Sequence, residues 1–130
     1  MDVRVCHAPP LRGTLSVPPD KAICHRAVLA AAVASGETVI HPWPSAEDCQ
    51  RTLSVIQALG VMVRSEGDTV RIQGSGHEGC QAPSGPIFCG ESGTTFRLAA
   101  GLLAGQPFTS TLSDSRKHRI AAVFNRNVTN

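Results

Sequence analysis

The sequence predicts a mixed α/β (α+β) fold in which short strands alternate with amphipathic helices. Apolar residues recur at helical spacing in three segments, and short β-branched or apolar runs bounded by Gly, Pro or Ser lie between them. The resulting order, β-α-β-α-β-β, is complete by residue 73, and a β-α-β order then begins again. We therefore expect one complete unit over residues 13–73 and an incomplete second unit over residues 74–112.

The first half of the first unit is a predicted strand, Gly13–Val17, followed by a helix from Lys21 to Ala34. Asp20 is placed to cap this helix, and Ser35-Gly36 ends it before a strand at 37–41. The residues expected to face the core are Ile23, Ala27, Ala30, Ala31 and Ala34.

The second half contains a helix capped by Ser45, with Asp48 three residues later completing a capping-box pattern. Gly60 ends this helix, and two strands follow at 61–64 and 69–73 around the turn SEGD. The apolar stripe of the helix is Cys49, Leu53, Ile56 and Leu59.

The second unit starts after a Gly- and Pro-rich loop, 74–86, with a short strand at 87–89. Ser92 is placed to cap the next helix, and a strand follows at 108–112. Its expected buried face is Phe96, Ala99, Ala100 and Leu103. Residues 113–130 form a polar tail that contains at most a short helical piece.

Composition excludes several classes of function. The net charge of the 130 residues is +2, aromatic residues make up 4% and Tyr is absent, so we expect no nucleic-acid partner. No apolar run is long enough to span a membrane, and the first residues do not resemble a signal peptide. The five cysteines show no CxxC pair and no Cys/His metal spacing. These features favour a cytoplasmic protein with reduced thiols and without a metal.

The stretch PPDKAICHRA can be read in two ways. Its acid and its apolar residues suit an ordinary helix start. However, Lys21 and Arg26 are cations near the positive end of the helix dipole, where bound anions rather than cations are stabilised. The alternative is therefore an anion-binding site.

A second candidate is the strand-to-helix turn CGESGTTFR. Gly90 and Gly93 would let the backbone approach a ligand, and amides at a helix start suit phosphate or carboxylate. The pattern is neither a dinucleotide fingerprint nor a P-loop, and many such turns bind nothing. Glu91 argues against an anion here.

Three segments together resemble the amino-terminal part of 5-enolpyruvylshikimate-3-phosphate synthase. They are LRGTLSVPPDKAICHRAVLAAAVASGETVI, AEDCQRTLSVIQALGV and GESGTTFRLAAGLLAG, and the resemblance runs from Leu11 to Leu112. The related enolpyruvyl transferase acting on UDP-N-acetylglucosamine lacks the DK-x-x-x-HR pattern and is a distant alternative.

The resemblance implies an inside-out fold of two domains, each built from three β-α-β-α-β-β units, with residues 1–12 as a strand belonging to the second domain. It implies transfer of the enolpyruvyl group of phosphoenolpyruvate to the 5-hydroxyl of shikimate 3-phosphate, with release of phosphate. This shikimate-pathway reaction of aromatic amino acid biosynthesis uses no metal or organic cofactor in the family.

The resemblance also implies roles for residues of the first helix. Lys21 matches the lysine that contacts phosphoenolpyruvate and lies beside both substrates. Arg26 matches an arginine that binds shikimate 3-phosphate, and Ala22 stands where the family usually has a serine for the same substrate. The alanine at position 22 cannot make that hydroxyl contact.

Further roles follow for the second half of the chain. Gly93 matches the glycine lining the phosphoenolpyruvate site, where the inhibitor glyphosate also binds, and Glu91 replaces the usual asparagine. Arg97 matches an arginine that we interpret as structural. Arg119 matches an arginine that clamps phosphoenolpyruvate, although the neighbouring glycine and proline of that motif are absent and its spacing is one residue short. No catalytic acid or base is assigned within these residues.

Two residues inside these segments keep simpler interpretations. Asp48 is expected to act as a capping acid rather than a site residue, and His25 as a packed or supporting histidine.

For the whole chain, three hypotheses remain open: a truncated transferase with half a site, a non-catalytic module that binds a phosphorylated ligand, or a half that requires a complementing chain.

Overall fold

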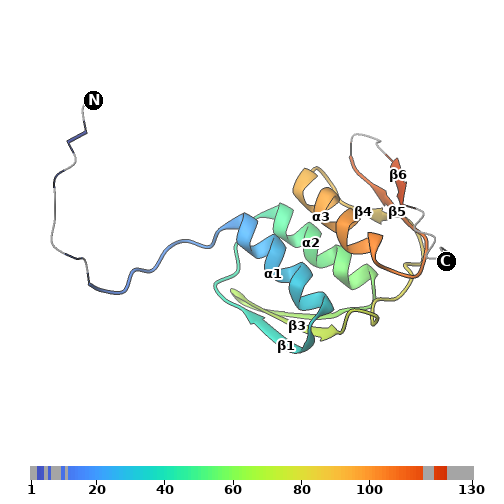
Figure 1. Cartoon of the computed structure of the whole chain (residues 1–130), viewed down its shortest axis with the longest axis horizontal. Coiled ribbons are helices and arrows are strands. Elements are labelled where there is room, and N and C mark those ends of the chain that lie inside the picture. Colours follow the sequence, from blue (N-terminus) through green and yellow to red (C-terminus); the bar gives the residue numbers. More distant parts are fainter. Residues whose placement is uncertain (1–2, 5, 7–9, 11, 116–118, 123–130) are drawn as a thin grey trace, which may run out of the picture.

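Three helices lie side by side between two small sheets in the computed structural model (Figure 1). The structure describes residues 3–4, 6, 10, 12–115 and 119–122, the last four in their backbone. Helices α1 and α2 contact the first sheet, whereas α2 and α3 contact the second. This arrangement confirms the predicted mixed α/β class.

The first sheet has the strand order β1-β3-β2, with β1 at Ser35–Ile40, β2 at Met62–Glu66 and β3 at Thr69–Ser75. Both outer strands run antiparallel to β3. Gly67, at φ +62°, permits the tight turn between β2 and β3, because glycine adopts this conformation without a Cβ clash. The strands and the turn predicted here are confirmed, with shifts of one or two residues at their ends.

Helix α1 spans Lys21–Val33, and Asp20 caps it as predicted, its Oδ1 accepting a hydrogen bond from the Ile23 N–H at 2.9 Å. The predicted core face is wrong in part: Ile23 is 69% exposed and Ala30 is also exposed, whereas Ala31 is buried as predicted and Ala27 and Ala34 are half-buried. Alanines occupy several sides of this helix, so their spacing does not select a face; Val28 and Leu29 are the large apolar residues that pack into the core. The residues actually buried are Cys24, His25, Val28, Leu29, Ala31 and Ala32.

Helix α2 spans Glu47–Ala58 and begins at Ala46, which makes no side-chain capping bond. The predicted Ser45 cap and the capping role of Asp48 are therefore wrong, since the helix starts one residue later than that pattern requires. Its predicted stripe is confirmed, because Cys49, Leu53, Ile56 and Leu59 are all buried. Leu53 and Ile56 pack in the core beneath the first sheet, while Val55 and Leu59 pack beneath the second.

The second sheet has the order β4-β5-β6, with β4 at Ile87–Phe88, β5 at Ser110–Ser113 and β6 at Arg119–Ala122. Strand β4 runs parallel to β5, and β6 runs antiparallel to it. Helix α3, Gly93–Ala104, connects β4 to β5, and Ser92 caps it as predicted. The tail was expected to contain at most a helical piece; instead β6 pairs along β5, a long-range contact that local periodicity does not reveal.

The strand predicted at Gly13–Val17 is absent: these residues are extended but pair with no strand. Leu15 and Val17 are 84% and 68% exposed, and the segment leads away from the helices (Figure 1). A strand needs a partner as well as an alternating pattern, and no partner edge lies beside this segment in the described structure. Most of residues 1–12 lie outside the described residues, so the second-domain strand stays a prediction.

Candidate functional site

The first residue of α1 contacts α2 through an ion pair. Lys21 Nζ lies 3.4 Å from Asp48 Oδ2, and the two side chains are 60% and 45% exposed. Because the pair is open to solvent, the ammonium remains accessible to a ligand. Asp48, which the sequence pattern assigned to capping, is thus a partner of the predicted anion-binding lysine.

A cleft of about 370 Å³ lies between the start of α2 and the loop from β4 to α3. Asp48 lines it, so the Lys21–Asp48 pair stands at its border. The structure thereby brings together parts of all three segments on which the sequence comparison rested. The residues that line the cleft are Glu47, Asp48, Arg51, Phe88, Gly90, Glu91 and Ser115.

Arg51 is a cleft residue that sequence reasoning missed. Its Nη2 donates to Glu47 Oε1 at 2.8 Å, and its guanidinium carbon lies 5.5 Å from the centre of the Phe88 ring. A Cβ at Gly90 would lie 2.9 Å from Arg51 Nε, so glycine is what allows this packing. The i, i+4 spacing of Glu47 and Arg51 was the available signal, although it also occurs on ordinary exposed helices.

The start of α3 faces solvent beside this loop. Ser92 Oγ accepts the Thr95 N–H at 3.2 Å, and the preceding N–H groups of Gly93 and Thr94 have no acceptor within an α-helix. Such amides favour anions. Gly93 is exposed and a Cβ there would lie 3.5 Å from Arg97 Nη1, but Gly93 does not line the cleft.

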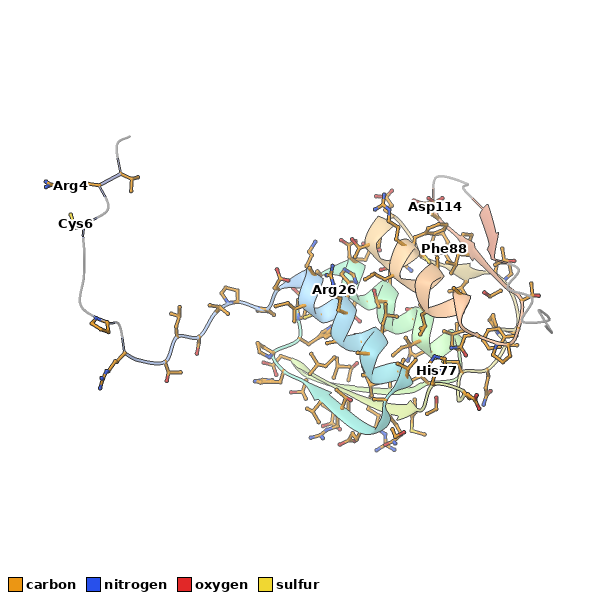
Figure 2. The ribbon with its side chains drawn as sticks, in the orientation of Figure 1. Arg4, Cys6, Arg26, His77, Phe88 and Asp114 are labelled. Atoms are coloured by element: carbon orange, nitrogen blue, oxygen red, sulfur yellow. The ribbon has the colours of Figure 1, made fainter. Side chains whose placement is uncertain are left out.

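Arg26 and Ala22 lie on one face of α1 but outside the cleft lining. Arg26 Nη1 donates to the Ala22 carbonyl oxygen at 2.8 Å, and both residues are exposed. Figure 2 labels Arg26 on α1. Arg119 is placed only as part of the backbone of β6, where it pairs with Ser113, and its side chain lies outside the described residues. Leaving aside the side chain of Arg119, Lys21 is therefore the predicted substrate residue that the structure brings to the border of the cleft.

Negative charge dominates the described residues that line the cleft. Glu47, Asp48 and Glu91 contribute three carboxylates, and the positive charge of Arg51 is paired with Glu47. Lys21 offsets a second carboxylate, that of Asp48, from the border. Glu91 makes no hydrogen bond or ion pair with another described residue. The charge of these described residues is thus unfavourable to an anion unless further cations approach.

Beneath the cleft, His25, Thr52, Thr95 and Ser92 form a buried chain of hydrogen bonds. Burial lowers the pKa of His25; the Asp48 carboxylate opposes this shift, and Lys21 and Arg26 reinforce it. This confirms the packed role expected for His25. Thr52 was missed, although a threonine within an otherwise apolar helix stripe was a usable signal.

None of the cysteines with a shifted pKa is activated as a nucleophile, because each shift is upward and disfavours the reactive thiolate. Burial, with a smaller effect of Asp114, raises the pKa of Cys89 to about 11, and burial also raises the pKa values of Cys24, Cys49 and Cys80. The thiols of Cys24 and Cys49 are buried, as expected of core residues. Over the part of the chain that is described, no three His, Cys, Asp or Glu side chains are grouped to hold a metal, and no helix is long and apolar enough to cross a membrane.

Comparison with known proteins gives a consistent result. The family model described as EPSP synthase (3-phosphoshikimate 1-carboxyvinyltransferase) matches residues 6–119. A 3-phosphoshikimate 1-carboxyvinyltransferase from Pelotomaculum thermopropionicum is 46% identical over 114 residues, which cover 87% of this chain and 26% of the relative. One from Streptococcus pyogenes is 47% identical over 103 residues, covering 79% and 24%.

The fold agrees with these sequences. EPSP synthase from Acinetobacter baumannii superimposes with a TM-score of 0.73 at 34% identity, over 79% of this chain and 23% of that protein. This chain thus spans about a quarter of the length of the curated relatives it matches. With a family match over residues 6–119 and the same fold over most of the described structure, the chain belongs to the EPSP synthase (3-phosphoshikimate 1-carboxyvinyltransferase) family.

Proposed function

We propose that this chain forms one wall of an enolpyruvyl transferase site and binds shikimate 3-phosphate and phosphoenolpyruvate there. The observation that carries the proposal is Lys21, an exposed cation at the border of the cleft, in a motif that matches the family's substrate lysine. Arg26 and the amides at the start of α3 would add donors for phosphate or carboxylate, with Ala22 and Gly93 beside them. Arg119 would join the phosphoenolpyruvate contacts from β6, and glyphosate would compete at the same place.

The chain would contribute binding rather than the full reaction. Transfer of the enolpyruvyl group proceeds by addition to phosphoenolpyruvate and elimination of phosphate, and it requires proton transfers as well as clamping of anions. The described residues offer no set of acid and base groups in the cleft that we assign to those transfers. The described cleft lining is acidic, so beyond Lys21, Arg26 and Arg119 we expect further cations from the part of the relatives' length that this stretch does not cover.

A complementing polypeptide would supply those cations. The exposed apolar side chains of Leu15 and Val17, on an extended segment without a strand partner, support such an association. We propose a cytoplasmic location for the complex, since the described thiols are free.

A complementation assay tests the partner hypothesis. Mixing this chain with the remaining three quarters of the Pelotomaculum relative should restore phosphate release. If the mixture stays inactive, the hypothesis that this chain is a partner-dependent half is contradicted and a binding module is favoured.

Calorimetric titration with shikimate 3-phosphate tests the binding proposal. We expect saturable binding that Lys21→Ala weakens by about 1.5 kcal/mol, the lower end for a hydrogen bond to a charged group, because the ammonium is exposed. Arg64→Ala, which removes an exposed cation from β2, is the matched control and should leave the affinity unchanged. Equal affinity of the wild-type chain and the Lys21→Ala variant would refute the assignment.

A further inference from the structure

A buried chain of hydrogen bonds joins the three helices inside the molecule. His25 Nδ1 lies 2.6 Å from Thr52 Oγ1, Thr52 Oγ1 lies 2.8 Å from Thr95 Oγ1, and Thr95 Oγ1 donates to Ser92 Oγ at 2.7 Å. The chain of bonds runs from α1 through α2 to the cap of α3. The exposed fractions of these side chains are 3% for His25, 0% for both threonines and 5% for Ser92.

Each member lies within about one helical turn of a residue of the proposed site. His25 and Thr52 come four residues after Lys21 and Asp48, and Thr95 comes two residues after Gly93. Thr95 Oγ1 also lies 3.3 Å from the backbone oxygen of Asp48, so α3 contacts the start of α2 directly. The network therefore runs directly beneath the three helix starts that carry the site.

The cost of leaving a buried polar group unpaired ties this network to one placement of the three helices. A buried imidazole or hydroxyl left without a partner is costly, so the helices are held where every member is satisfied. Each hydroxyl has one proton to donate, and the neutral imidazole has one donor and one acceptor nitrogen. Both threonine hydroxyls also lie within reach of the Asp48 backbone oxygen, at 3.4 Å from Thr52 Oγ1 and 3.3 Å from Thr95 Oγ1, so the network is tied to the start of α2.

We propose that His25, Thr52 and Thr95 are positioning residues, and that their network holds the three helix starts in the mutual placement that lets Lys21 and the amides at Gly93 meet one ligand. The part that concerns the ligand rests on the proposed function. The part that concerns the placement of the helices does not.

The test compares Thr52→Val, which removes the hydroxyl while keeping the shape, with Thr52→Ser, which keeps the hydroxyl. Val55→Ala, a truncation in the same helix away from the network, is the control for lost stability. We expect Thr52→Val to shift the amide resonances of Lys21 and Gly93 and the ¹⁵N resonance of His25 Nδ1. It should also weaken shikimate 3-phosphate binding about tenfold, the equivalent of one hydrogen bond. Thr52→Ser and Val55→Ala should keep the wild-type resonances at these sites and the wild-type affinity.

The placement claim is overturned if Thr52→Val leaves the Lys21, Gly93 and His25 resonances unchanged, and the ligand claim is overturned if those resonances shift while the affinity stays constant. If the wild-type chain shows no saturable titration, the proposed function fails, and the resonances alone still decide the placement claim. If Thr52→Val does not fold, the same resonances and affinity are measured for Thr95→Val and Thr95→Ser, and the same outcomes decide both claims.

Discussion

The ammonium of Lys21 and the carboxylate of Asp48 meet at 3.4 Å, linking the first residue of α1 to the first turn of α2 at the border of the cleft. Both side chains remain about half exposed or more. Water therefore screens the pair, and the contact serves to place a cation rather than to stabilise the fold.

This gives a first prediction about stability. Asp48→Asn should change the free energy of unfolding by less than about 1 kcal/mol, since exposed ion pairs contribute little. In the same urea-denaturation series, Ile56→Ala, at a fully buried position of α2, should cost about 2–5 kcal/mol. A loss of similar size in both variants would show that the pair is structural.

Glu91 is predicted to oppose anion binding. Its carboxylate lies in a cleft already lined by Glu47 and Asp48, so Glu91→Asn removes a like charge from the ligand's surroundings. The affinity for phosphoenolpyruvate should rise by about 1 kcal/mol, the Coulomb energy of two charges near contact in water. Calorimetry would measure it, with Glu78→Gln on an exposed loop as the control. Weaker binding by Glu91→Asn would indicate that this carboxylate contacts the ligand favourably.

Two glycines of the same turn should respond differently to alanine. Gly90 has φ +61°, and a Cβ there would lie 2.9 Å from Arg51 Nε, so Gly90→Ala should destabilise the chain by about 1–2 kcal/mol. At Gly93 the added Cβ would make an ordinary 3.5 Å contact with Arg97 Nη1, so Gly93→Ala should leave stability within about 0.5 kcal/mol. Thermal unfolding of the pair measures the contrast, and equal effects would contradict the geometry of the turn.

His25 should make stability depend on pH. Burial lowers its pKa in the folded state below the ordinary histidine value of 6.5, so the unfolded chain binds the proton more readily. The contribution is therefore fully present above pH 6.5 and is lost as the pH falls through the lower folded-state pKa. Urea unfolding at pH 7.5 and 5 should show a larger decrease for the wild-type chain than for His25→Gln, while exposed His77→Gln should match the wild type. Identical pH dependence in the wild type and His25→Gln would exclude this linkage.

Much of the fold could be predicted from local chemistry. Asp20 and Ser92 cap helices because their side chains can accept the first free N–H groups, and the stripe from Cys49 to Leu59 is buried because its spacing matches one helix face. The core face of helix α1 was predicted only in part, because alanines on several sides of the helix give no contrast between its faces. The strand at Gly13–Val17 and β6 depend on partner edges distant in sequence, which local patterns do not contain.

The site was predicted in part. Lys21 was found because its charge opposes the dipole of its own helix, an arrangement that an ordinary helix start does not need. Asp48, Arg51 and Thr52 join the candidate site through contacts with other elements, so a capping or stripe pattern within α2 could not assign them. The side chain of Arg119 and its role at phosphoenolpyruvate stay predictions.

The most direct test of the account is a phosphate-release assay on the purified, mass-verified 130-residue chain with phosphoenolpyruvate and shikimate 3-phosphate. Because one acidic wall with an exposed lysine cannot provide the electrostatic stabilisation of a closed site, we predict binding without release above the uncatalysed background. Release at ordinary enzyme rates, about 1–100 per second, from this chain alone would contradict the claim that it forms one wall of the site.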